Sequence, residues 1–454
     1  MTDPIAAARQ SFAADLEDLR RFVRFPSVSA DPARKTDVQA CRDFLVAQLR
    51  DAGLSAEVWS TRGQDSVYAE SPVVPGKPTV LVYGHYDVQP AAREDGWEGD
   101  PFTLAERDGL LVGRGVSDDK APVLALVKAV AAFTRSGIGF PVRFKFLIEG
   151  EEETGSPNLD ALVSERLERL RADLVAISDS SWIADGKPCL VYGLRGLVYG
   201  YVRVRGPKVD VHSGHHGGPL ANPHIELARI LAATRAPNGK IKIPGFLDRV
   251  RPVGAAEKKR IRALRYDLAA WKKELGLEKT LAKNALDCLL QRWALPTFEV
   301  HGITGGYTGP GSKTIIPSHA EAKVSMRLVP DQDPDEIRRL FEEHVKRLSP
   351  DAEVRWEVGG PAFLTDPEGP HLEAARRAFL DGFGVKPCLV REGGSIPAVG
   401  LLSKKLGVPI VLLPIGLPDD GAHSPNEKFS REHFEKGIEM FVHYFRIVGG
   451  TSAA

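Results

Sequence analysis

Cysteine is scarce in this chain of 454 residues: the four thiols at positions 41, 189, 288 and 388 lie far apart and form no Cys-x-x-Cys pair. This scarcity excludes a dense disulfide framework. Long apolar runs are also missing, since no stretch approaches the roughly 20 residues that a membrane-spanning helix needs. We therefore expect reduced cysteines and a cytoplasmic protein that does not bind a membrane.

The chain also lacks an excess of charge of either sign, because 60 Lys and Arg balance 60 Asp and Glu. A neutral chain has no overall attraction to nucleic acid or to an anionic membrane. One segment, 249–293, is locally basic, with twelve Lys or Arg against five Asp or Glu. We interpret this segment as a solvated helical face, since aromatic residues are sparse and no nucleic-acid-binding motif accompanies it.

What the chain does have is an alternation of strand and helix patterns over its first 200 residues, which predicts an α/β architecture. From Leu197 the pattern changes to alternating, half-exposed strands and a long helical stretch, and the first pattern returns near residue 360. We therefore predict one discontinuous α/β domain over 1–196 and 359–454, interrupted by an inserted α+β domain over 197–358.

Histidine, aspartate and glutamate cluster directly after the apolar strands of the first pattern. Because the functional crevice of an open α/β sheet lies beyond the carboxyl ends of its strands, these groups should converge on one site. The clusters are Gly84-His85-Tyr86-Asp87, Glu149 to Ser156, Ser178-Asp179 and His423 to Glu427, with Asp118-Asp119 at a helix start between the first two.

Each cluster alone has a plain structural explanation, such as a helix cap or a solvated run of charge. Together they place many carboxylates side by side, where they repel one another and are costly to bury. One or two divalent cations resolve both problems, and imidazole with carboxylate but no thiolate suits zinc, manganese or cobalt. Five ligands and a bridging water can hold two metals roughly 3.5–4 Å apart.

The adjacent pair Glu152-Glu153 fits such a site, because one carboxylate can bind metal while its neighbour takes a proton from the water. Asp87, two residues beyond His85, is placed to orient that imidazole.

The motifs Gly84-His-Tyr-Asp-Val-Gln-Pro90, Gly113 to Lys120 and Glu151-Glu-Glu-Thr-Gly-Ser156 resemble the dinuclear zinc peptidase family of aminoacylases, acetylornithine deacetylase and carboxypeptidase G. Other motifs resemble the branch of the carnosine and cytosolic non-specific dipeptidases. They are Asp95-Gly-Trp97, Tyr192 to Gly196, Lys313 to Pro317, Arg327 to Pro330, Arg391 to Pro397 and His423-Ser-Pro-Asn-Glu427. The resemblance extends from about residue 20 to about residue 445.

The resemblance implies two divalent ions per subunit, zinc in the first place and manganese or cobalt as alternatives. One ion would be held by His85 and Asp179 and the other by Glu153 and His423, with Asp118 bridging both. Glu152 would be the general base, and Asp87 would support His85. Asp119 would serve only as a structural cap.

The resemblance also implies that the discontinuous domain is catalytic, with a central mixed sheet flanked by helices, and that the insert is a lid through which the chain forms a homodimer. His212, in Val211-His-Ser-Gly214, would reach the partner subunit's site and stabilise the oxyanion. The choice of His212 over His215 and His216 depends on the His-Ser-Gly match alone. Thr314, Arg327 and Ser395 match substrate-binding positions.

These observations lead us to expect a metal-dependent dipeptidase, in which a water bridging two metal ions attacks the peptide bond. An N-acyl or N-carbamoyl amino acid amidohydrolase on the same scaffold is the alternative. A non-catalytic binding homologue is disfavoured, because every ligand of the family and Glu152 are present.

Overall fold

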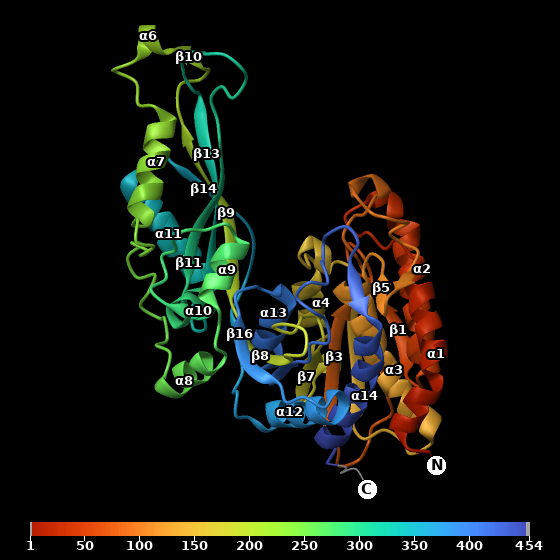
Figure 1. Cartoon of the computed structure of the whole chain (residues 1–454). Helices are drawn as coiled ribbons and strands as arrows, with labels where there is room; N and C mark the ends of the chain where they lie inside the picture. Colours follow the sequence, from red (N-terminus) through yellow and green to blue (C-terminus); the bar gives the residue numbers. More distant parts are fainter. Residues whose placement is uncertain (1, 451–454) are drawn as a thin grey trace. The chain divides into compact units, whose positions relative to one another are not determined.

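The computed structural model describes residues 2–450, which divide into two compact units (Figure 1). The first unit holds the chain up to Tyr192, Thr365–Val390 and the chain from Leu401 onward, and the second holds Gly193–Leu364 and Arg391–Gly400. We had placed the whole of 359–454 in the first domain. The segment Arg391–Gly400 belongs to the second unit because it is bonded to that unit, as in the hydrogen bond from Arg327 to Ser395.

A six-stranded mixed sheet forms the centre of the first unit, in the order β1-β2-β6-β3-β7-β17. Strands β6, β3, β7 and β17 run parallel to one another, whereas β2 is antiparallel to both of its neighbours, β1 and β6. The bounds are β1 Ser55–Trp59, β2 Ser66–Glu70, β6 Arg143–Glu149, β3 Thr79–His85, β7 Leu174–Ile177 and β17 Ile410–Leu412. The parallel strands are buried on both faces, as such strands require.

Long helices pack around α3 in the first unit. Helix α3 is almost wholly buried, begins with a proline in its first turn and ends at Gly137, whose φ of 73° suits a left-handed C-cap. It contacts α1 and α14, and α14 contacts α12. The helices of this unit are α1 Pro4–Val23, α2 Lys35–Asp51, α3 Ala121–Ser136, α4 Leu159–Glu165, α5 Leu167–Leu170, α12 Pro370–Phe383 and α14 Arg431–Val448.

Two small sheets complete the strands of this part of the chain. Strands β18 Lys428–Ser430, β5 Leu110–Val112 and β4 Ala105–Arg107 form one of them. The other consists of β15 Phe363–Leu364, β8 Cys189–Leu194 and β16 Cys388–Glu392, at the points where the chain passes between the two units. The chain returns to the first unit within helix α13, Pro397–Leu406, between Gly400 and Leu401.

The second unit is built on a four-stranded antiparallel sheet in the order β11-β13-β9-β14. Burial alternates along β9, so that Val198, Val202 and Val204 face the core with Met326 and Phe341. Helices α7 Pro223–Thr234 and α11 Pro334–Leu348 contact the sheet. The strands are β11 Thr297–Thr304, β13 His319–Leu328, β9 Gly196–Arg205 and β14 Glu353–Gly360.

Two further parts of the second unit bear on function. At one end of the sheet, β10 Val211–His212 pairs with β12 Ile315–Ile316, and α6 Ser213–His216 follows β10. The basic segment 249–293 is broken into three short helices, α8 Ala255–Ala263, α9 Leu268–Glu274 and α10 Ala285–Trp293. The predicted α/β fold with a central mixed sheet and an inserted domain is confirmed.

The four cysteines are free thiols. Within residues 2–450, no helix combines the length and the apolarity that crossing a bilayer requires.

Candidate metal centre

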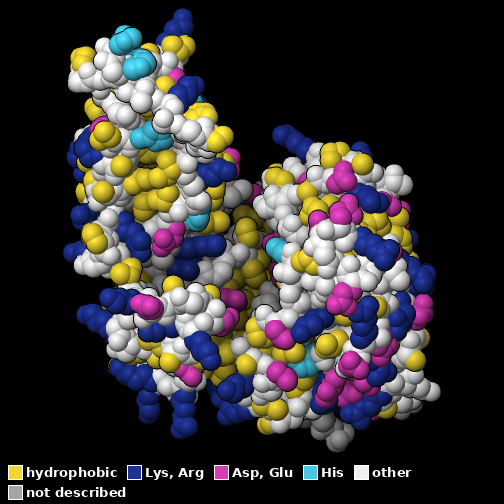
Figure 2. Space-filling model, turned by 45° about the horizontal axis from the view of Figure 1, so that its top comes forward, with side chains coloured by type: hydrophobic (Ala, Val, Ile, Leu, Met, Phe, Trp, Pro, Cys, Tyr) yellow, Lys and Arg dark blue, Asp and Glu magenta, His cyan; other side chains and the backbone are white. Residues whose placement is uncertain are grey.

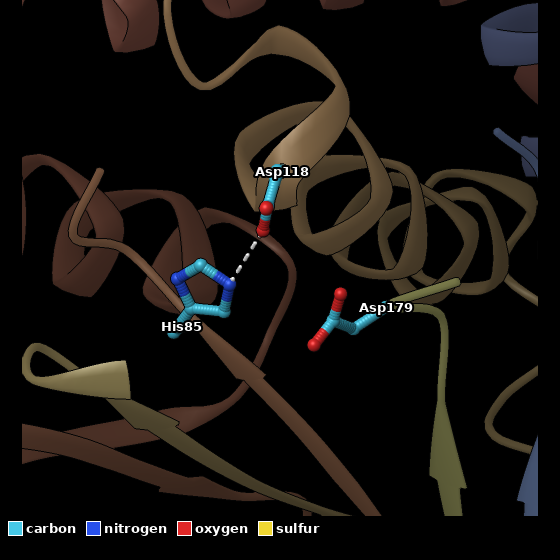
Figure 3. A group of neighbouring side chains, drawn as sticks. All are labelled: His85, Asp118 and Asp179. Atoms are coloured by element: carbon cyan, nitrogen blue, oxygen red, sulfur yellow. Dashed lines mark hydrogen bonds and ion pairs between the residues drawn. The ribbon is translucent and has the colours of Figure 1, made fainter. Parts of the chain in front are cut away.

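Five candidate metal ligands of the first unit form two groups that share one residue. Ligand atoms of His85, Asp118 and Asp179 all lie within 4.8 Å of one another (Figure 3), and so do ligand atoms of Asp118, Glu153 and His423. The parallel pairing of β3 with β6 and β7 explains the convergence of His85, Asp179 and Glu153, because the carboxyl ends of parallel strands meet at one edge of a sheet. Asp118 comes from the turn directly before α3.

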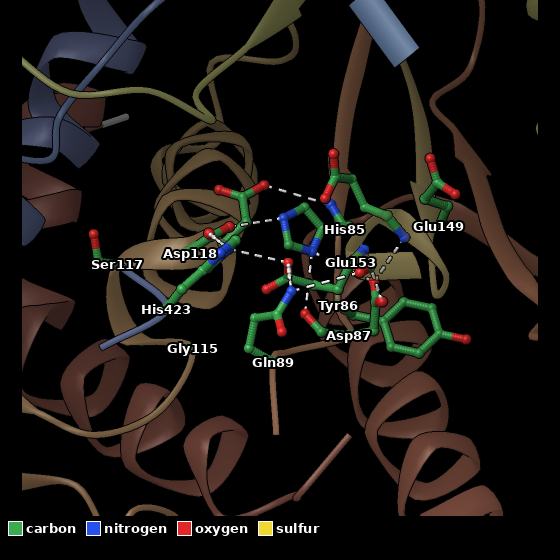
Figure 4. Close-up of polar contacts among 12 residues, drawn as sticks. His85, Tyr86, Asp87, Gln89, Gly115, Ser117, Asp118, Glu149, Glu153 and His423 are labelled. Atoms are coloured by element: carbon green, nitrogen blue, oxygen red, sulfur yellow. Dashed lines mark hydrogen bonds and ion pairs between the residues drawn. The ribbon is translucent and has the colours of Figure 1, made fainter. Parts of the chain in front are cut away.

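Asp118 presents one oxygen to each histidine (Figure 4). Its Oδ1 lies 3.0 Å from Nε2 of His85, and its Oδ2 lies 3.0 Å from Nε2 of His423. The same His423 nitrogen is 3.1 Å from Oε2 of Glu153. The His85 ring is completely buried, whereas the His423 side chain is 55% exposed. A carboxylate with two separately directed oxygens has the geometry of a bridging ligand.

Asp87 connects His85, a ligand of the first group, to the turn Glu152–Glu153, which carries a ligand of the second. Its carboxylate accepts the backbone N–H groups of Glu152 and Glu153, each at 3.2 Å, and the hydroxyl of Ser29 at 2.6 Å. Nδ1 of His85 is hydrogen-bonded to the backbone carbonyl of Asp87 at 3.1 Å, and Oδ1 of the fully buried carboxylate lies 3.4 Å from the same nitrogen. One residue therefore orients the imidazole, and its carboxylate also fixes the turn that carries both glutamates.

Asp119 is not the helix cap that we expected. Helix α3 begins two residues later, and no side chain caps its first turn. Asp119 is instead buried against β3, where its Oδ2 accepts the backbone N–H of His85 at 3.4 Å. A Cβ at Gly84 would lie 2.8 Å from this oxygen, so the glycine before His85 leaves the space that Asp119 fills. The tertiary contact with β3 replaces local capping.

Glu427 is a residue whose role the motif did not reveal. This buried glutamate accepts hydrogen bonds from Nη1 of Arg114 at 2.7 Å and from the backbone N–H groups of Gly115, Ser117 and Asp118 at 2.8, 2.7 and 3.1 Å. It thereby connects the loop of His423 to the turn of Asp118. Its position four residues after His423 was the only signal in the sequence.

Gln89 is a second residue that holds a candidate ligand and whose role the motif did not reveal. Its side-chain amide donates to Oε2 of Glu153 at 2.8 Å. It lies in the motif that begins at Gly84. Ser29, which donates to Asp87, stands outside every motif, so no sequence signal identified it.

Negative charge accumulates at this site. Burial raises the pKa of Glu152 to about 8, and the charges of Asp179, Asp118 and Glu153 act in the same direction. Burial also raises the pKa of Asp119 well above its usual value, again with help from Asp179. Within the described part of the chain, no Lys or Arg forms an ion pair with Asp118, Glu152 or Glu153.

The histidines respond to the same excess of negative charge. Hydrogen bonds with Asp118 and Glu153 raise the pKa of His423 to about 10. Converging carboxylates and imidazoles, with no Lys or Arg of the described residues paired to Asp118, Glu152 or Glu153, are the donor set and the electrostatic environment that a divalent cation requires. The residues present therefore fit a metal site.

The expected substrate-binding residues lie in the second unit, in two separate places. Nη1 of Arg327 donates to Oγ of Ser395 at 2.7 Å. His212 pairs with Ile315, next to Thr314, whose carbonyl accepts the N–H of Ser213 at 3.0 Å. Histidine side chains are visible on the surface at this end of the unit, where α6 and β10 lie (Figures 1 and 2).

Strand β13 separates these two places. It begins at His319, beside the end that carries β10 and β12, and Arg327 lies eight residues further along. At about 3.3–3.4 Å per residue, the two ends are about 27 Å apart. The structure therefore groups His212 with Thr314, and Arg327 with Ser395.

A sequence model of peptidase family M20/M25/M40 matches residues 81–446. The chain belongs to this peptidase family. It is 36% identical over 455 residues to the Cys-Gly metallodipeptidase of Schizosaccharomyces pombe, which covers 96% of this chain and 95% of that protein. It is 37% identical over 451 residues to human Beta-Ala-His dipeptidase, covering 95% of this chain and 89% of the human protein.

The peptidase also matches a solved structure described as an M20 family metallo-carboxypeptidase from Sulfolobus solfataricus. The two chains superpose with a TM-score of 0.88 at 30% identity, over 96% of this chain and 99% of the other. The agreement extends over both units, so the inserted antiparallel domain is part of the shared fold.

Metal-free peptidase should lose stability as the pH rises from about 5 to 8. The pKa of Glu152 is raised from 4.5 to about 8, and that of Asp119 is raised well above 3.8. The folded state therefore keeps protons on these carboxyls at pH values where the unfolded state has released them. Such stability is present at low pH and is lost as the pH passes through the raised pKa values. Thermal unfolding in chelator, measured across this range, should show Tm falling with pH.

Two comparisons control this prediction. Glu152→Gln, which cannot titrate, should show a shallower fall of Tm. Saturating zinc should remove most of the pH dependence by neutralising the carboxylates. A Tm in chelator that does not change between pH 5 and 8 would contradict the prediction.

Proposed function

We propose that this peptidase is a metal-dependent dipeptidase that uses two divalent cations, zinc in the first place. The observation that supports this most directly is the pair of ligand groups that share Asp118, with Glu152 adjacent to the ligand Glu153. The names of the two curated relatives support a dipeptide substrate. An assay of a panel of dipeptides and N-acyl amino acids with added zinc, manganese or cobalt tests the proposal.

The panel separates the possible outcomes. Cleavage of dipeptides in preference to acyl amino acids supports the dipeptidase. Preferential cleavage of N-acyl or N-carbamoyl amino acids would replace it with an amidohydrolase that uses the same metal site. No hydrolysis of any compound, with metal content verified by elemental analysis, would refute catalysis.

In this proposal His85 and Asp179 hold one ion, Glu153 and His423 hold the other, and Asp118 binds both. When bound, the ions polarise the peptide carbonyl and lower the pKa of the attacking water. Asp87 and Glu427 do not touch the ions; they hold His85, the Glu152–Glu153 turn and the Asp118 turn by the hydrogen bonds described above.

Glu152 is the general base of the proposed mechanism. Its carboxylate accepts a proton from the attacking water, and the same proton then passes to the nitrogen of the leaving amino acid. The backbone hydrogen bond from Glu152 to Asp87 fixes the position of this side chain relative to Glu153. The oxyanion that forms is stabilised by a donor from the second unit, for which we propose His212.

Glu152→Gln should retain metal and substrate binding but lose turnover. The amide has the shape of the carboxylate yet cannot accept a proton, and loss of a general base costs about 10²–10⁴-fold in kcat. Metal content and KM should stay close to those of the unaltered enzyme. The matched control is Glu151→Gln, since Glu151 is bonded to Asn158 at 2.8 Å. If turnover is lost in the control and kept in Glu152→Gln, the base is Glu151.

Arg327 and Ser395 form the proposed binding site for the free carboxylate of the dipeptide. The guanidinium already donates to Oγ of Ser395, and its remaining N–H groups can donate in parallel to a carboxylate. Burial lowers the pKa of Arg327 from its usual value, so the cation is partly desolvated and gains from pairing with an anion.

Amidating the C-terminus of a good dipeptide substrate should lower kcat/KM by about 10–100-fold, because a charge-assisted hydrogen-bonded pair is lost. Arg327→Ala should make the enzyme indifferent to amidation, whereas Arg203→Ala, an exposed arginine on β9, should retain the discrimination. Steady-state kinetics on the free and amidated dipeptides measure both effects. Equal cleavage of the two by the unaltered enzyme would show that the carboxylate is not recognised.

We further propose a homodimer through the inserted domain, in which His212 and Thr314 act on the partner subunit's substrate. A dipeptide is at most about 7 Å long, whereas His212 and Arg327 of one chain lie at opposite ends of a strand about 27 Å long. One chain therefore cannot contact the same dipeptide with both residues. A second copy that supplies His212 and Thr314 resolves this conflict.

Mixing two inactive variants, His212→Ala and Glu152→Gln, should partly restore activity as hybrid dimers form. In a hybrid, one site has an intact Glu152 from its own chain and an intact His212 from the other. Activity is measured after subunit exchange, and exchange itself is verified with differently tagged chains. Complete exchange without any recovery would exclude a role for His212 across the dimer.

A further inference from the structure

The side chains of Arg195 and Arg327 and the backbone of Arg292 meet at the loop Gly393–Ser395 of the second unit. Nε of Arg195 donates to the carbonyl of Gly393 at 3.0 Å, and Oγ of Ser395 donates to the carbonyl of Arg195 while accepting from Arg327. A Cβ at Gly393 would lie 2.9 Å from Nη2 of Arg195 and 2.7 Å from the carbonyl oxygen of Arg292. The absence of a side chain at Gly393 allows these segments to pack closely.

Within the described residues, none of the guanidinium groups of Arg195, Arg292 and Arg327 forms an ion pair with Asp or Glu, although Arg391 beside them pairs with Glu257 at 2.6 Å. The charge of Glu299 acts on Arg195 without forming an ion pair with it. Burial, followed by the charges of Arg327 and Arg292, lowers the pKa of Arg195 to about 10. Guanidinium groups that repel one another and have lost part of their hydration are stabilised when an anion binds between them.

Arg292 comes from the segment that we had interpreted as a solvated helical face. Its guanidinium donates to the hydroxyl of Tyr266 at 2.8 Å and lies 5.7 Å from the ring centre of Trp271. These contacts fix the exposed side chain of Arg292, and its positive charge acts on both Arg195 and Glu392. The inserted basic segment thus contributes to the arginine cluster.

We propose that Arg195 and Arg292 form a second anion subsite beside Arg327, which binds the acidic side chain of a C-terminal Asp or Glu. The subsite rests on the proposed function, in which Arg327 and Ser395 bind the α-carboxylate of the dipeptide. Arg195 uses only its Nε in the hydrogen bonds described, so both of its Nη groups are available for a second carboxylate. The substrate class is therefore dipeptides that end in a dicarboxylic amino acid.

The test compares Ala-Glu with Ala-Gln, which differ in charge but hardly in shape. The unaltered enzyme should have a KM for Ala-Glu about tenfold below that for Ala-Gln, the value of one desolvated charged hydrogen-bonded pair. Arg195→Gln should remove this difference, so that the ratio of the two KM values becomes about one. Arg195→Lys should retain part of it, and Arg203→Gln all of it.

A binding measurement keeps the subsite testable apart from hydrolysis. Calorimetric titration of the metal-loaded protein with glutarate and with its monoamide, glutaramate, should show tighter binding of glutarate, and Arg195→Gln should abolish the preference. If no dipeptide is cleaved, the proposed function is refuted. The titration still shows whether Arg195 binds a second carboxylate, because it does not depend on hydrolysis. Equal KM values for Ala-Glu and Ala-Gln, or a preference that survives Arg195→Gln, would overturn the inference.

Discussion

The carboxylate of Asp118 is shared between two histidines, and the candidate site depends on this arrangement. Each oxygen of the carboxylate lies 3.0 Å from one imidazole, with Asp179 on one side and Glu153 on the other. The shared position concentrates negative charge that Lys and Arg do not neutralise within the described residues. This charge is the physical reason why the site suits a divalent cation, and together with burial, the larger cause, it raises the pKa of the neighbouring Glu152.

The ligands around Asp118 are held in place by side chains that themselves accept backbone hydrogen bonds. Asp87 accepts from the turn of Glu152 and Glu153, and Glu427 accepts from the turn that ends at Asp118. Both carboxylates are buried, so each hydrogen bond is shielded from water and is correspondingly costly to lose. The positions of the candidate ligands therefore depend on two residues that belong to neither ligand group.

The second unit distributes its functional side chains along one long strand. Because β13 is about 27 Å long, residues at its two ends serve different purposes within one chain. In the proposed dimer, the end near His212 and Thr314 acts on the other copy. The end near Arg327 lies close to arginines from segments that are distant in the sequence, and within residues 2–450 none of Arg195, Arg292 and Arg327 forms an ion pair with Asp or Glu.

Local sequence determined much of this protein. The apolar strands, the ligand types that follow them and the change to half-exposed strands at Leu197 all follow from periodicity and residue chemistry, and the predicted fold class and family are confirmed. Tertiary structure decided what those patterns do not encode. Asp119 packs against β3 and caps no helix, and Arg391–Gly400 joins the second unit. Glu427 and Arg195 acquire their partners only through folding, because those partners are remote in the chain and no local pattern specifies contacts between remote residues.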